Sequence, residues 1–129
     1  MDQEALVTEF HKAAATVEKL YGPVSLLLLV APDEQTTDAW NVIVSADGLD
    51  SKPRGEAVRV FTDSLRKSLS QVLWRVVARA TVLRTTDPFV TAFNSRYAAL
   101  SAGAALDAVS VAGVELPRVV VVEASRRAA

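Results

Sequence analysis

The sequence predicts an α+β fold, with a mostly antiparallel sheet of four to five strands and about three helices packed on one face. Helical and strand-like periodicities alternate along the chain in the order α-β-β-α-β-α-β(-β). The first two strand-like segments are joined by a short polar loop, which favours an antiparallel hairpin. Half of the 129 residues are hydrophobic. This is enough for one globular domain over residues 1–124, followed by a flexible tail over 125–129.

The first third of the chain contains a helical pattern followed by two strand patterns. Residues 3–20 predict an amphipathic helix, ended by Gly22 and Pro23. Residues 24–30 (VSLLLLV) form a short segment that is apolar on both faces and bounded by prolines, which predicts a buried strand. Residues 40–46 (WNVIVSA) alternate and predict a second strand. The apolar positions of the predicted helix recur every three or four residues and are Leu6, Phe10, Ala13, Val17 and Leu20.

The remainder of the chain continues this alternation. Residues 54–70 predict a second amphipathic helix, and residues 73–86 predict a strand with alternating faces. Asp87 followed by proline is typical of a helix start and predicts a third helix over 87–100. Residues 108–124 predict extended structure that bends near a glycine.

The predicted arrangement leaves one sheet face without a helical cover. If every helix packs on the face that carries Trp40, the opposite face is too apolar to meet water, and such a patch marks an interface. We therefore predict that this face forms a homodimer or binds a protein partner, with its arginines facing acidic groups. The alternative is that one helix crosses over and covers the face. The predicted interface residues are Leu27, Leu29, Ile43, Arg75, Val77, Arg79 and Leu83.

Charge is strongly segregated along the chain. Residues 1–51 hold nine acidic and two basic side chains, whereas residues 52–96 hold nine basic and three acidic ones. The segregation predicts attraction between two parts of one fold, or between two copies of it. A weaker alternative is nucleic-acid binding through residues 52–96. The low isoelectric point of about 5.8 and the small number of aromatic residues argue against that alternative.

The turn before the second predicted helix is the best candidate for a small-ligand site. Ser51, Lys52 and Arg54 lie in the stretch SKPRG, which combines a hydroxyl, two cations and a proline. The first turn of a helix has free N–H groups and positive potential, so an anion such as phosphate or carboxylate is the expected ligand. The neighbouring aspartates are typical of turns and predict no metal site.

Several kinds of chemistry have no counterpart in the sequence. The chain has no cysteine and one histidine, His11, which excludes disulfides and any multi-histidine or cysteine metal site within one chain. No nucleotide-binding glycine loop or nucleophile elbow is present, so no cofactor and no catalytic residue are predicted. Whether the protein is an enzyme stays open at this point.

The chain carries no pattern for membrane insertion. Its longest apolar run, residues 23–32, is shorter than the roughly 20 residues that span a bilayer. The first residues, MDQEAL, are acidic and do not resemble a signal peptide. A cytoplasmic protein is therefore expected. Its function is predicted to be self-association or protein interaction, with binding of a small anion as the alternative.

Overall fold

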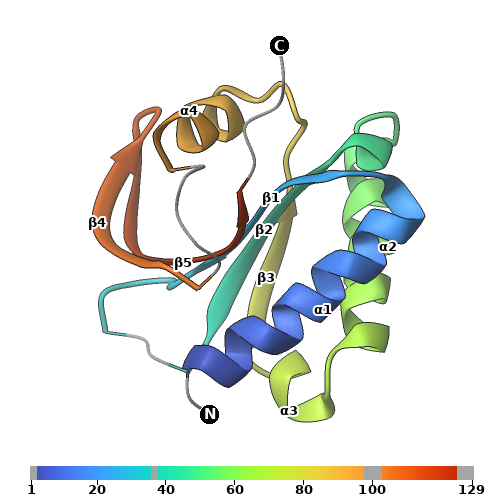
Figure 1. Cartoon of the computed structure of the whole chain (residues 1–129), viewed down its shortest axis with the longest axis horizontal. Coiled ribbons are helices and arrows are strands. Elements are labelled where there is room, and N and C mark those ends of the chain that lie inside the picture. Colours follow the sequence, from blue (N-terminus) through green and yellow to red (C-terminus); the bar gives the residue numbers. More distant parts are fainter. Residues whose placement is uncertain (1–2, 36–37, 98–102, 125–129) are drawn as a thin grey trace.

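The structure of the chain is a computed structural model, and it describes residues 3–35, 38–97 and 103–124. The fold is α+β, with a five-stranded sheet in the order β3-β2-β1-β5-β4 (Figure 1). Three of the four neighbouring strand pairs are antiparallel, and β2 and β3 run parallel. The helices are α1 (Gln3–Tyr21), α2 (Arg54–Ser68), α3 (Gln71–Trp74) and α4 (Pro88–Tyr97), with a short 3₁₀ helix η1 (Asp47–Leu49); the strands are β1 (Val24–Val30), β2 (Trp40–Ala46), β3 (Val77–Val82), β4 (Ala105–Val111) and β5 (Val114–Ala124).

The predicted fold class is confirmed, and the first elements match closely. The helix expected over 3–20 is α1, and the two strands of the expected hairpin are β1 and β2. The helix expected over 54–70 is α2. Residues 98–100 of the third expected helix and the expected tail over 125–129 lie outside the described residues.

The strand expected over 73–86 is wrong at both ends. Residues 71–74 form the short helix α3, because Ser70 caps it by accepting a hydrogen bond from the backbone N–H of Leu73. Strand β3 then covers only Val77–Val82. The chain leaves the sheet before Asp87, whose Oδ1 accepts a hydrogen bond from the N–H of Phe89 at the start of α4.

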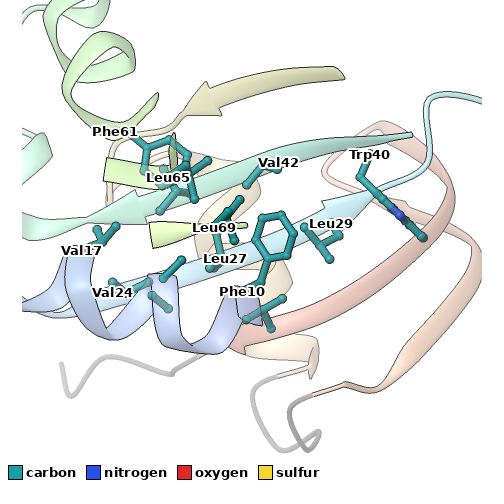
Figure 2. Close-up of a cluster of buried hydrophobic side chains, with 14 of the residues drawn as sticks. Phe10, Val17, Val24, Leu27, Leu29, Trp40, Val42, Phe61, Leu65 and Leu69 are labelled. Carbon is teal, nitrogen blue, oxygen red and sulfur yellow. The ribbon is translucent and has the colours of Figure 1, made fainter. Parts of the chain in front are cut away.

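The first core lies between the sheet and the helices α1, α2 and α3. Phe10 of α1 and Phe61 of α2 are completely buried against the sheet. Figure 2 shows these two rings pointing toward the side chains that one face of β1 and β2 presents, among them Leu27 and Val42. Burying each large apolar side chain contributes about 1.5–3 kcal/mol relative to leaving it exposed, so this layer is the main source of stability.

A second core lies on the opposite face, where α4 packs. Phe89, Val90 and Phe93 of α4 are buried against Leu26 and Leu28 of β1, together with residues of β5. Figure 1 shows α4 on the other side of the sheet from α1 and α2. Three helices therefore share one face, and a fourth crosses to the second face, which is the alternative that the sequence left open.

Leu27 and Leu29 of strand β1 lie on the opposite face of the sheet from the one that was predicted. Leu27 pairs with Val44 and Leu29 with Val42, so both leucines share the face of Trp40 and are buried under α1 and α2. Every residue of this strand except Ser25 is apolar, so the strand has no alternation from which its faces can be assigned. Only its register with β2 determines them.

Strand β3 contains an irregularity that changes the orientation of Val77. Trp40 pairs with Val77, but Asn41 pairs with Arg79, so Ala78 is an extra residue in β3. Val77 therefore packs on the first core together with Ala80 and Val82. Leu83 packs against the second core. The two residues therefore lie on opposite faces of the sheet, whereas simple alternation along the strand predicted that they share one face.

Candidate anion-binding site

The turn after β2 directs the predicted anion-binding residues toward the end of β3. The helix η1 buries Leu49, and the N–H of Lys52 donates to the Leu49 carbonyl at 3.2 Å. Gly48 is required here, because a Cβ at this position would overlap the backbone of Tyr21 at the end of α1. The turn is thus held in place by α1 before the chain enters α2 at Arg54.

A pair of hydrogen bonds joins this turn to the segment after β3. Asp50 accepts from the backbone N–H of Thr85 at 2.9 Å and also from the Thr85 hydroxyl. Thr85 is buried, and the two residues are 35 positions apart in the chain. Because Arg84 precedes Thr85, the contact fixes the backbone of Arg84 beside the start of α2.

These two segments enclose a small pocket of about 100 Å³. A pocket of this size has room for several water molecules and therefore for an oxyanion group such as phosphate or carboxylate. The lining residues are Leu49, Asp50, Lys52, Arg54, Ala57, Val82, Leu83, Arg84 and Asp87.

The charged side chains of the pocket differ in whether they already have partners. Both carboxylates accept hydrogen bonds within the chain, Asp50 from Thr85 and Asp87 from Phe89. The side chains of Arg54 and Arg84 are exposed and form no ion pair with any residue that the structure describes. The hydrogen bonds to neutral donors leave both carboxylates charged, so three cationic and two anionic side chains give the pocket a formal charge of +1, which favours an anion.

Lys52 is held differently from the two arginines. Its Nζ lies 5.9 Å from the centre of the Tyr21 ring, at the far limit of a cation–π contact. The side chain is half-buried, unlike those of Arg54 and Arg84. This contact orients the ammonium group at the rim of the pocket without neutralising its charge.

The structure brings two of the three predicted anion-binding residues into this pocket and adds one that the sequence did not identify. Ser51 is exposed and does not line the pocket, and the N-cap of α2 is Pro53, which has no side-chain acceptor. Arg84 is the added residue. Arg84 is 30 residues from Arg54 in the chain, so no local sequence pattern connects the two arginines. The contact that brings their segments together is the hydrogen bonding between Asp50 and Thr85.

The residues predicted to form an interface are divided among several environments. Leu27 and Leu29 are buried in the first core, and Val77 is half-buried against it. Ile43 and Leu83 are half-buried against the second core. Arg75 and Arg79 are exposed. The structure thus separates this set, and α4 packs on the part of the expected face that β1, β4 and β5 form.

Two further features bear on chemistry. His11 Nδ1 lies 3.6 Å from a carboxylate oxygen of Glu123, on the exposed side of α1. In the described ranges, no group of three or more histidine, aspartate or glutamate side chains is arranged to hold a metal ion.

None of the helices in the described ranges combines the length and the apolar character needed to cross a bilayer.

The pocket is therefore a candidate site on the basis of its geometry and its charged side chains. Comparisons of the chain with protein-family models, with curated proteins and with solved structures find no match.

Proposed function

We propose that the protein binds a small oxyanion, or the anionic group of a larger ligand, in the pocket between the start of α2 and the end of β3. The observation that carries the proposal is the convergence of Lys52, Arg54 and Arg84 on one pocket from two separate segments. The pocket also contains two carboxylates, Asp50 and Asp87, so its three cationic side chains leave a formal charge of +1.

The start of α2 adds to this attraction. Its N-cap, Pro53, offers no side-chain acceptor to the first-turn N–H groups of the helix. These groups and the helix dipole favour negative charge. Arginine also offers a planar fork of donors that matches phosphate and carboxylate oxygens.

The expected affinity is modest because the arginines are exposed to solvent. A dissociation constant of about 1 mM corresponds to about −4 kcal/mol. Two or three solvent-screened, charge-assisted hydrogen bonds supply this amount after the cost of ordering the side chains. A tighter ligand would need contacts outside the pocket.

Nucleic-acid binding receives less support from the structure. Arg75 and Arg79 are exposed, but sequence-tolerant binding of single strands relies on stacking of bases on aromatic rings. All eight aromatic residues fall in the described ranges, and none of them is exposed. Trp40 is buried and Trp74 packs against the first core.

Self-association stays a prediction. It was based on an uncovered apolar sheet face, and in the described residues α4 packs on the part of that face that β1, β4 and β5 form. The exposed large hydrophobic residues that the structure describes, Leu20, Val72 and Val114, belong to three different elements and are not the set expected at the interface.

The proposal is tested by titrating the ¹⁵N-labelled protein with inorganic phosphate at a constant ionic strength of about 0.1 M and following its amide NMR signals. We expect saturable shifts at residues 54–56 and 83–85. The double variant Arg54→Glu/Arg84→Glu is expected to bind phosphate at least about tenfold more weakly, since charge-assisted hydrogen bonds contribute about 1.5–3 kcal/mol each.

Lys67→Glu is the matched control. Lys67 is exposed in the last turn of α2, 13 residues after Arg54 and about 20 Å away at 1.5 Å per helical residue. That distance exceeds the Debye length of about 10 Å at 0.1 M salt. Equal loss of affinity in both variants, or no saturable shift at residues 54–56 and 83–85, would overturn the proposal.

A further inference from the structure

We propose that the anion bound in this pocket is the terminal carboxylate of an extended peptide, which adds as a strand to the free edge of β3. This inference rests on the proposed function and names the ligand class for the same pocket. It joins two features, the cationic pocket and an edge strand that ends in it.

Strand β3 is at the end of the sheet order, and its only neighbour is β2. The N–H of Leu83 donates to the carbonyl of Val44 in β2 at 2.9 Å. Since successive N–H groups along a strand point in opposite directions, those of Val82 and Ala80 point away from β2. Neither has a hydrogen-bond partner in the part of the chain that the structure describes.

The side chains of β3 agree with an open edge. All seven residues of β1 are buried, whereas none of the six residues of β3 is. Ala78 and Arg79 are exposed. From Arg79 to Val82 the register with β2 is continuous, so the edge beyond Ala78 is regular enough to pair with another strand.

The opposite edge of the sheet is built differently. Strand β4 is interrupted by Ala108, which has a positive φ of 52°. Asp107 beside it is 81% exposed and lies 3.9 Å from Arg118. Irregular backbone and charge are devices that prevent an edge from pairing. Strand β3 has its irregularity near its start, at Ala78, and its register with β2 is continuous from Arg79 to Val82, so this part of the edge is available for strand addition.

The direction of the added strand follows from the pocket. Val82, Leu83 and Arg84, at the end of β3, form one wall of it. A peptide that runs parallel to β3 brings its carboxyl end into the pocket, whereas an antiparallel peptide would bring its ammonium end into a pocket whose three cations outnumber its two carboxylates. Charge therefore selects the parallel orientation.

The length of the edge sets the length of the peptide. Five residues from Arg79 to Leu83 extend over about 16 Å at roughly 3.3 Å per residue. Main-chain hydrogen bonds along this edge would provide the affinity that the solvent-exposed pocket lacks, and the carboxylate would fix the register.

The test uses an acetylated hexapeptide of alternating threonine and valine with a free carboxyl end, compared with its C-terminal amide and with acetate. We expect the free acid to bind at least about tenfold more tightly than either. The amide signals of Ala80 and Val82 should shift together with those of residues 54–56. Two further peptides carry N-methyl groups on alternate nitrogens, and only one of the two sets should abolish binding.

Ala80→Pro provides a test from the side of the protein. Proline is tolerated on an edge strand where the N–H faces solvent, so the variant removes one donor to the peptide. It should lose peptide binding and keep its response to phosphate. The N-methylated peptides give the same information without altering the protein, so the inference does not depend on the folding of this variant.

The outcomes separate the two proposals. If phosphate and acetate shift the pocket signals but the free acid binds no more tightly than acetate, the peptide inference is overturned and the proposed function stands. If the acid and amide peptides bind equally, the carboxylate has no role and the inference is again overturned. If neither small anions nor peptides bind, both proposals are wrong.

Discussion

Asp50 accepts hydrogen bonds from both the backbone N–H and the hydroxyl of Thr85, and this contact joins the turn before α2 to the segment after β3. Each segment contributes an arginine to the same pocket, Arg54 from one and Arg84 from the other. The pocket is therefore formed by a tertiary contact that also contributes to stability. Substitution of Asp50 should consequently lower the stability of the protein, whereas substitution of the arginines should weaken anion binding.

Asp50→Ala should lower the free energy of unfolding by about 1–3 kcal/mol, because it leaves the donors of the buried Thr85 without their acceptor. Urea denaturation followed by circular dichroism measures the change. The control is Asp63→Ala, which breaks the exposed 2.8 Å ion pair with Arg66 and should cost less than about 1 kcal/mol. Equal losses in the two variants would mean that the Asp50–Thr85 contact is not a structural tie.

Two glycines in the same region should respond in opposite directions to alanine. Gly48→Ala should destabilise the protein, because the new Cβ would overlap the Tyr21 backbone and force α1 and η1 apart. Gly55→Ala should stabilise it by about 0.4–1 kcal/mol, since Gly55 lies in the first turn of α2 with nothing within 4 Å of the added carbon. Thermal unfolding midpoints of the two variants check the pair, and a rise for Gly48→Ala would contradict the packing described here.

The fold class was predictable because periodicity and turn residues agree along most of the chain. The faces of β1 were not predictable, since every residue of VSLLLLV except Ser25 is apolar and only the register with β2 assigns Leu27 and Leu29. The orientation of Val77 also escaped prediction. One extra residue, Ala78, reverses the alternation along β3, and no local signal in the sequence marks it.

The candidate site was predictable only in its local half. Lys52 and Arg54 follow from the chemistry of a turn that precedes a helix. Arg84 joins them through a contact between residues 35 positions apart, and pattern reasoning within short windows cannot detect such a contact. The position of α4 depends in the same way on tertiary packing, because an amphipathic helix fits either face of an apolar sheet.

Shortening the side chain of Phe93 in α4 should expose the second face of the sheet. Phe93 is completely buried, with its ring centre 4.8 Å from that of Tyr97 and 5.9 Å from that of Phe89. Phe93→Ala should lower the free energy of unfolding by about 3–5 kcal/mol. It should also increase the mass measured by light scattering at high protein concentration, as the apolar face becomes accessible. Leu20→Ala, at a position 60% exposed, is the control and should change neither quantity. A monomeric Phe93→Ala variant of unchanged stability would mean that α4 is not the cover of this face.

The turn between β4 and β5 should be open to stabilisation. Ala112 and Gly113 have φ values of 50° and 79°, which is the pattern of a two-residue turn with both central residues in the left-handed region. A Cβ is unfavourable there by about 1 kcal/mol, and asparagine tolerates this region better than alanine does. Ala112→Asn should therefore raise the midpoint of thermal unfolding by a few degrees, whereas the β-branched variant Ala112→Val should lower it. Ala112 is exposed, so the asparagine and valine variants differ mainly in the backbone conformation that each residue prefers. If the valine variant is as stable as the asparagine variant, the hairpin does not use this turn.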